Sequence, residues 1–265
     1  MHRPDLAALE RFYESPWGRW AREALRLRLE QMWPDLADLR LLAFGYPLPL
    51  LAGPPCDFVV AVPEALCARG GRPVPAGRVA VVREEELPFA DAVFDRVLLV
   101  HALEHARRPN RLLREIWRVL TDGGRLLVVV PNRHGLWCWS ERTPFGYGRP
   151  FTVGQLDRLL ATHLFEPAAR GHALWLPPLG RSLGPRLARL AEPIAARLAP
   201  AISGVLLREA EKRIYATTAL PVAAEGRTEM TRIRRRSLAK APAVAARDRT
   251  REVAEGELPV AARRR

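Results

Sequence analysis

The pattern that most constrains this chain is a pair of apolar runs joined by an amphipathic segment. The runs at 94–100 (FDRVLLV) and 125–130 (RLLVVV) are mostly continuous rather than alternating, which is typical of strands covered on both faces. Segment 109–120 has apolar residues at helical spacing, a proline at its start and Asp-Gly-Gly after its end, as expected of a bounded helix. A strand, a helix and a strand at this spacing predict a right-handed crossover between parallel strands. The chain is therefore expected to be an α/β protein.

The flanking sequence adds further elements to this unit. A helix is expected from Gly18 to Trp33, with Ser15 as its cap and Pro16 in its first turn. Two more helices are expected over 152–162 and 186–198, the second interrupted by a proline. The remaining strands are expected at 39–45, 57–62, 79–82 and 171–176, with a last strand pair or one bent strand formed by 203–207 and 213–216.

The composition bounds the class of protein. The chain has 265 residues, of which 48% are apolar, so a sizeable core can be buried. Its three cysteines are widely spaced and show no Cys/His metal spacing, which argues against a disulfide framework. No apolar run approaches the ~18–20 residues of a membrane span, and the first residues lack the apolar stretch of a secretory signal. We therefore expect a cytoplasmic protein with no bound metal and no membrane contact.

Part of the positive charge lies at the C-terminal end. The formal net charge is +13, and residues 221–265 hold twelve Lys and Arg against six Asp and Glu, with no aromatic residue. This composition predicts a disordered basic tail. Nucleic-acid binding through the tail is disfavoured, because no aromatic side chains are interleaved with the arginines to stack on bases. The expected organisation is an N-terminal helical extension (1–34), an α/β domain (35–220) and the tail.

Ligands of open parallel sheets bind beyond the carboxyl ends of the strands, so the residues that follow each strand are candidates for a site. Phe44, Gly45 and Tyr46 follow the first strand, and the glycine would let the backbone approach a ligand closely. An ordinary tight turn is the alternative. Glu84 and Glu85 follow the third strand, and their carboxylates either accept hydrogen bonds from a ligand or form a solvated turn.

The fourth strand is followed by His-Ala-Leu-Glu-His, in which His101 and His105 are candidate catalytic bases. On a helix, the spacing H-x-x-E-H would place two histidines on one metal ion. Here the segment follows directly on a strand, and Arg-Arg-Pro at 107–109 ends it before a two-turn helix can form. A strand end that lines a pocket is therefore favoured over a metal site, with a polar turn as the alternative.

A long loop rich in Gly, Pro, Trp and Arg follows the fifth strand, from 133 to 150. Loops of this length in compact domains are usually lids or binding loops. Its aromatic and basic side chains either line a substrate pocket or anchor the loop on the core. The candidate substrate residues are Arg133, Trp137 and Trp139.

The stretch from Leu87 to Arg133 resembles the central part of class I S-adenosylmethionine-dependent methyltransferases of the group called methyltransferase domain 11. It contains in order that group's Leu-Pro-Phe, Phe-Asp strand, amphipathic helix and Asp-Gly-Gly turn. Segments 12–20 (FYESPWGRW) and 143–152 (TPFGYGRPFT) are similar to a bacterial subgroup. The resemblance implies a three-layer Rossmann-like α/β fold: a seven-stranded, mostly parallel sheet with an antiparallel last strand and helices on both faces.

The resemblance also implies a cofactor and a reaction. The cofactor is S-adenosyl-L-methionine, and its methyl group passes to a small-molecule acceptor. The methionine end would lie over the first turn, the adenine against the turn after the third strand, and the sulfonium near the end of the fourth strand. Glu64 is a displaced substitute for the acidic residue that grips the ribose. The implied cofactor-binding residues are Phe44, Gly45, Tyr46, Glu64, Glu84, Glu85, Leu87 and His101.

One departure from the group keeps other functions open. The first turn reads FGYPLP, where the group has an acidic residue and several glycines. A non-catalytic, methyltransferase-like binding or regulatory module is therefore a second hypothesis. A nucleic-acid methyltransferase is a third, although the Asn/Asp-Pro-Pro-Tyr/Phe signature of amino-group modification is absent.

Overall fold

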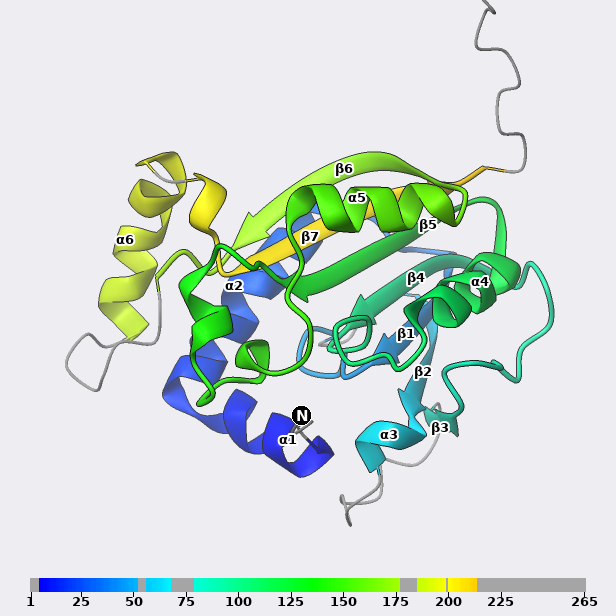
Figure 1. The fold of residues 1–265 in the computed structure, drawn as a ribbon, viewed down its shortest axis with the longest axis horizontal. Coiled ribbons are helices and arrows are strands. Elements are labelled where there is room, and N and C mark those ends of the chain that lie inside the picture. The colour runs from blue at the N-terminus through cyan, green and yellow to red at the C-terminus, as the bar shows by residue number, and fades with distance from the viewer. Residues whose placement is uncertain (1–4, 52–55, 68–78, 177–184, 199, 214–265) are drawn as a thin grey trace, which may run out of the picture. The chain divides into compact units, whose positions relative to one another are not determined.

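Seven strands form one mixed sheet in the computed structural model, which describes residues 5–51, 56–67, 79–176, 185–198 and 200–213. The strands are β1 (Arg40–Gly45), β2 (Asp57–Pro63), β3 (Val79–Val82), β4 (Phe94–Val100), β5 (Leu120–Pro131), β6 (Phe165–Ala173) and β7 (Val205–Lys212). Their order is β3-β2-β1-β4-β5-β7-β6 (Figure 1). Neighbours from β3 to β5 pair in parallel, whereas β7 lies between β5 and β6 and is antiparallel to both. The predicted sheet, with its antiparallel last strand, is confirmed.

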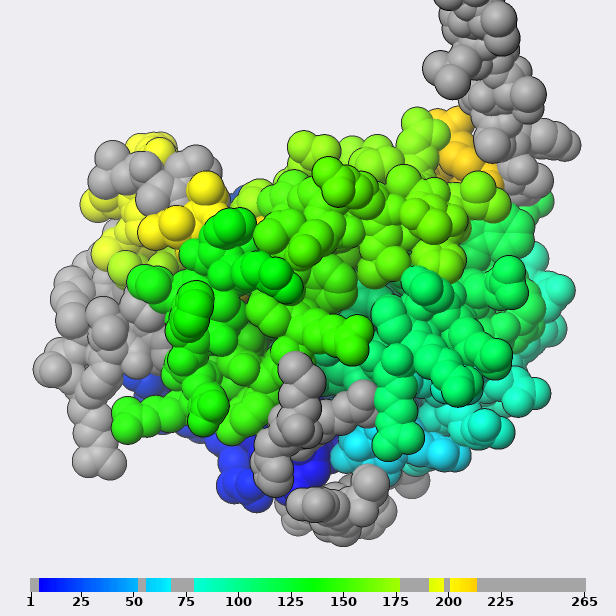
Figure 2. Space-filling model, viewed as in Figure 1, coloured from blue at the N-terminus to red at the C-terminus, as the bar shows by residue number. Residues whose placement is uncertain are grey.

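Helices cover both faces of the sheet. The α-helices are α1 (Leu6–Glu14), α2 (Pro16–Met32), α3 (Glu64–Cys67), α4 (Pro109–Val119), α5 (Val153–Thr162) and α6 (Pro185–Leu198). Three 3-10 helices are η1 (Leu136–Trp139), η2 (Pro144–Gly146) and η3 (Pro200–Ile202). In Figure 1, α4 and α5 lie in front of the sheet and α2 lies behind it. Side chains of α5 and of the loop after β5 close the front face (Figure 2).

The alternation of side chains along the strands produces two cores. Leu42 and Phe44 of β1 point to one face, where they join the buried residues of α4 and α5. Leu41 and Ala43 point to the other face and pack with α1 and α2. Because both faces of the strands are covered, continuous apolar runs are needed, as the sequence of β4 and β5 predicts.

The N-terminal helices begin where the chain offers caps. Ser15 Oγ accepts a hydrogen bond from the backbone N–H of Gly18 at 3.0 Å, and Pro16 occupies the first turn of α2. The predicted helix is confirmed: Ser15 is its cap and Pro16 its first residue. The preceding helix α1, capped by Asp5, was not predicted.

The expected bounds of the two C-terminal strands are wrong. The sixth strand runs over Phe165–Ala173 rather than 171–176; it is an edge strand, and the register shifts between Pro167 and Ala169, so its sequence is not continuously apolar. The last strand is the single β7, which agrees with the one-strand alternative rather than the strand pair. The expected segments, 203–207 and 213–216, miss its second half, because its buried Arg208 interrupts the apolar pattern. The predicted tail, 221–265, lies outside the described residues.

Candidate active site

Three buried titratable side chains, His101, Glu104 and His105, gather where β4 ends, and we call them the His-Glu-His cluster. The three residues are 1%, 2% and 5% exposed. His101 Nδ1 lies 3.3 Å from Glu104 Oε1, and one ligand atom from each residue lies within 4.8 Å of the others. His101 has a backbone φ of 50°, and such left-handed non-glycine residues gather at functional sites because the surrounding structure must hold them there.

The charge of Glu104 depends on its neighbours. Burial raises the pKa of a carboxyl group, because it penalises the charged form. The side chain of His101 and the nearby His105 favour the carboxylate, and together they hold the pKa of Glu104 below its ordinary value. The cluster therefore places a buried negative charge beside two imidazoles.

Tyr13 of α1 reaches this cluster from the N-terminal part of the chain. Its hydroxyl forms a hydrogen bond of 2.8 Å with His101 Nε2, and its ring lies 5.9 Å from that of Tyr46. Burial, with smaller contributions from Tyr46 and Glu104, raises the pKa of Tyr13, so the hydroxyl remains protonated at neutral pH. Nothing in the sequence of α1 indicates that Tyr13 meets His101.

The turn after β1 packs directly against the end of β4. Gly45 has a φ of 99°, and a Cβ at this position would collide with the carbonyl oxygen of Val100. The backbone N–H of Tyr46 donates to the same oxygen at 2.8 Å. The structure thus brings Gly45, Tyr46 and His101 together, whereas the side chain of Phe44 is fully buried in the core beneath α4 and α5.

A hollow of about 400 Å³ opens at the carboxyl ends of β2 and β3, and we call it the acidic hollow. It brings Glu64 together with the adjacent pair Glu84 and Glu85, which follow the next strand of the chain. Arg83 and Arg107 also line it. Glu84 Oε1 accepts a hydrogen bond from the backbone N–H of Arg107 at 2.7 Å, and Glu85 forms an ion pair of 3.1 Å with Arg108.

The acidic hollow has the chemistry that the adenosine half of the expected cofactor requires. Its carboxylates can accept hydrogen bonds from ribose hydroxyls and from an exocyclic amine, and its volume lies in the range of small-molecule sites, ~300–1,000 Å³. Leu87 lies beyond its rim; it is buried, and its backbone N–H donates to Glu115 Oε2 at 3.0 Å. The residues present therefore fit this half of the cofactor.

The three predicted substrate residues do not meet on one surface. Trp137 is fully buried and stacks on Trp20, with ring centroids 5.7 Å apart and an interplanar angle of 23°. Its indole N–H donates to the carbonyl oxygen of Leu176 at 2.8 Å. Trp139 is 77% exposed, and Arg133 is exposed, with a guanidinium contact of 3.5 Å to the carbonyl of Pro150. Trp137 thus anchors the loop on the core, which is the alternative interpretation of its sequence.

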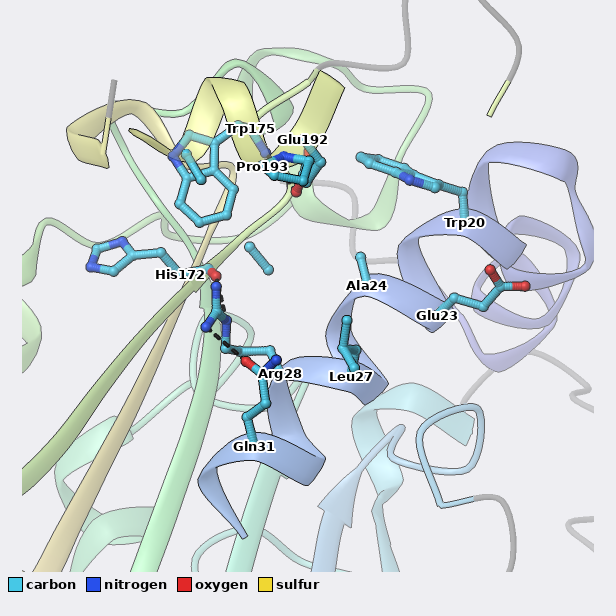
Figure 3. Close-up of a pocket in the computed structure, with 12 residues that line it drawn as sticks. Trp20, Glu23, Ala24, Leu27, Arg28, Gln31, His172, Trp175, Glu192 and Pro193 are labelled. Carbon is cyan, nitrogen blue, oxygen red and sulfur yellow. Dashed lines mark hydrogen bonds between the residues drawn. The ribbon is translucent and has the colours of Figure 1, made fainter. Parts of the chain in front are cut away.

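A second hollow, of about 360 Å³, lies between α2, the end of β6 and α6 (Figure 3). Trp20 and Trp175 stand on two of its sides in Figure 3. Arg28 lies on a third side and donates to the carbonyl oxygen of His172 at 3.1 Å. Glu192 also lines this hollow, and burial raises its pKa. The ring of Trp137 stacks on Trp20, so an aromatic layer separates this hollow from the His-Glu-His cluster.

The sheet has the strand order of the class I methyltransferase fold, with the antiparallel β7 inserted between β5 and the edge strand β6. In this fold, the carboxyl ends of β1 to β4 form the side of the sheet where ligands are expected. A solved structure of an S-adenosylmethionine-dependent methyltransferase from Thermotoga maritima has the same fold, with a TM-score of 0.54, 19% identity, and coverage of 78% of this chain and 96% of that chain.

A family model also matches part of the chain. Residues 62–128, about a quarter of the sequence, match the family described as "Methyltransferase domain". Protein YafS of Escherichia coli is 34% identical over 113 residues, 43% of this chain and 44% of YafS. The ubiquinone/menaquinone biosynthesis C-methyltransferase UbiE of Bordetella avium is 44% identical over 55 residues, 21% of this chain and 22% of UbiE. The chain therefore spans less than half the length of either relative.

Within the described ranges, every helix is too short or too polar to cross a bilayer.

Proposed function

We propose that this chain is an S-adenosylmethionine-dependent methyltransferase that acts on a small-molecule acceptor. The observation that carries the proposal is the position of the buried His101–Glu104 pair, which lies beside the Gly45 turn at the ligand edge of a class I sheet. The cofactor supplies a methyl group that is already activated. The tasks of the chain are therefore to bind, to align and to exclude water.

The acidic hollow would hold the adenosine half of the cofactor. Glu64 stands at the carboxyl end of β2, where its carboxylate can accept hydrogen bonds from ribose hydroxyls. Glu84 and Glu85 face the same hollow. Gly45 and Tyr46 would border the methionine half, close to His101.

His101 is the proposed base for an acceptor that must lose a proton. Glu104 lies on the Nδ1 side of the imidazole, where a carboxylate can orient the ring. Nε2 faces the hydroxyl of Tyr13, so the position of that hydroxyl marks where an acceptor O–H or N–H would lie after α1 moves. His105, in the same cluster, is the second candidate base. Arg133 and Trp139 are the proposed acceptor contacts on the loop.

A titration of the full chain with S-adenosylmethionine and S-adenosylhomocysteine in a calorimeter tests cofactor binding. Glu64→Gln should weaken binding about 10-fold or more, because a hydrogen bond to a charged group is lost. The matched control is Glu141→Gln, an exposed carboxylate on the loop after β5, which should leave the affinity unchanged. Release of S-adenosylhomocysteine in a screen of small hydroxyl, amine and carbon acceptors then tests turnover.

A non-catalytic binding module is the second candidate function. The hydrogen bond of Tyr13 to His101 favours it, because the Tyr13 side chain occupies the space beside His101 Nε2 where a ligand would lie. The same calorimetry separates the two functions. Failure of wild-type chain to bind cofactor at millimolar concentration would exclude the enzyme and leave the module.

A further inference from the structure

The His-Glu-His cluster contains more buried polar atoms than its neighbours satisfy. Both carboxylate oxygens of Glu104 and Nδ1 of His101 are buried, and within the described ranges they have no hydrogen-bond partner. The 3.3 Å approach of Nδ1 to Oε1 does not meet hydrogen-bond geometry. A buried carboxylate without donors is costly, and a cation bound at this place would offset that cost.

We infer that His101, Glu104 and His105 form a binding site for a divalent transition-metal cation. The donor set is two imidazole nitrogens and one carboxylate oxygen, a combination that suits Zn²⁺ and other first-row divalent ions and leaves a coordination position open. One ligand atom of each residue already lies within 4.8 Å of the others. Ligand bonds to Zn²⁺ are ~2.0–2.2 Å long, so small side-chain rotations would bring all three atoms onto one ion.

The surrounding residues hold these ligands as an outer shell would. The hydroxyl of Tyr13 contacts Nε2 of His101 at 2.8 Å. When Nε2 carries the proton, Nδ1 and the carboxylate of Glu104 face each other as lone pairs, and a cation between them would relieve the repulsion. Metal-ligating histidines usually donate their second N–H to such an oxygen, which fixes the tautomer.

The loop after β5 fixes the backbone and one ring of the cluster. The N–H of Arg149 donates to the carbonyl oxygen of Glu104 at 2.9 Å. Gly148 has a φ of 82°, and a Cβ there would lie only 2.8 Å from Nδ1 of His105. A glycine at this position therefore lets the loop pack against the imidazole and restrict its rotation.

A bound cation would change the chemistry of the site, and this part of the inference rests on the proposed function. A metal-bound hydroxyl loses its proton more readily, because the positive charge lowers its pKa. The cation would thus replace His101 as the means of activating an acceptor hydroxyl. Metal binding itself does not depend on methyl transfer and can be measured alone.

The test uses the full chain after removal of metal by a chelator, titrated with Zn²⁺ and separately with Co²⁺. One equivalent of each ion should bind. The visible spectrum of the Co²⁺ form should lack a thiolate charge-transfer band, since the ligands are nitrogen and oxygen. Glu104→Gln and His105→Gln should each weaken Zn²⁺ binding about 100-fold or more.

Glu141→Gln and His134→Gln are matched controls, because both residues are exposed and outside the cluster; they should leave the affinity for Zn²⁺ unchanged. Circular dichroism checks the fold of each variant, and if Glu104→Gln does not fold, His105→Gln and the Co²⁺ spectrum decide. Absence of binding, equal binding by all variants, or a thiolate band would overturn the inference. Titration with S-adenosylmethionine is run in parallel, so that loss of metal binding is distinguished from failure of the proposed methyltransferase.

Discussion

Tyr13 and His101 are separated by 88 residues in the chain, and the Tyr13 hydroxyl lies 2.8 Å from His101 Nε2. Both side chains are buried, and their rings meet edge to face at 5.8 Å. The contact ties α1 to the end of β4, so the N-terminal part of the chain contributes to the candidate active site. Opening of this contact is the step that would admit a ligand to Nε2.

Tyr13→Phe tests the strength of this contact. The variant keeps the ring but leaves Nε2 of His101 without its partner, which costs ~1–3 kcal/mol for a buried polar group. We expect the free energy of unfolding in urea to fall by that amount. Tyr147→Phe is the control: Tyr147 is only partly buried, and its change should stay within ~0.5 kcal/mol. Equal stability of the wild type and Tyr13→Phe would show that the hydroxyl contact contributes nothing.

A pair of glycine substitutions tests how closely the first turn packs on β4. Gly45 and Gly123 both have positive φ, at 99° and 71°, but a Cβ at Gly123 meets no atom within 4 Å. Gly123→Ala should therefore lose only the conformational term, ~1 kcal/mol. Gly45→Ala adds a collision with the carbonyl of Val100, and we expect a loss of ~3 kcal/mol or more in chemical denaturation. Similar losses of stability in the two variants would mean that the turn at Gly45 can accommodate a Cβ by shifting away from the carbonyl of Val100.

Glu115 predicts how stability depends on pH. A hydrogen bond from Arg118, opposed by burial and aided by the N–H of Leu87, lowers the pKa of Glu115 below its ordinary value of 4.5. Because the folded pKa is below the unfolded one, the contribution to stability is fully present above pH 4.5 and is lost as the pH falls through the folded value. Glu115→Gln should therefore be less stable than wild type at pH 7, with a difference that shrinks in acid.

Thermal unfolding of wild type and Glu115→Gln from pH 7 down to pH 3 measures this difference. The control is Glu30→Gln, whose ion pair with Arg26 is exposed on α2 and contributes little. Its unfolding temperature should follow that of wild type at every pH. A constant difference between wild type and Glu115→Gln across the range would contradict the assigned linkage.

The sequence predicts the parallel half of the sheet well, because β4 and β5 are buried on both faces and must be apolar. It predicts β7 poorly, because three of its buried residues, Arg208, Glu209 and Lys212, are charged. Glu209 accepts a hydrogen bond from the indole N–H of Trp33 at 2.9 Å, and Lys212 donates to the carbonyl of Leu120 at 2.7 Å. Because these partners lie in distant segments of the chain, no local sequence pattern predicts the contacts.

The same distinction applies to the candidate site. His101 and His105 follow a recognisable strand, and their position at its carboxyl end is predictable. The acidic hollow is partly predictable, since Glu64 and Glu84 each follow a strand of the parallel sheet. The contact of Tyr13 with His101 depends on how α1 packs across the sheet edge, and the sequence gives no local signal for that packing.

The two tryptophans of η1 have different expected roles: Trp137 stabilises the core, and Trp139 is a candidate ligand contact on the loop after β5. Trp137→Ala removes a fully buried side chain that stacks on Trp20, and truncation of a buried Trp costs ~3–5 kcal/mol. Trp139→Ala removes a side chain that is 77% exposed and should change the free energy of unfolding by less than ~0.5 kcal/mol. Urea denaturation of the two variants, side by side, measures this difference in stability.

If Trp139 contacts the acceptor, Trp139→Ala should also raise KM for the acceptor with cofactor affinity unchanged. A large loss of stability in Trp139→Ala would instead place that side chain against the core. A small loss in Trp137→Ala would show that the stacked pair of Trp137 and Trp20 does not anchor the loop.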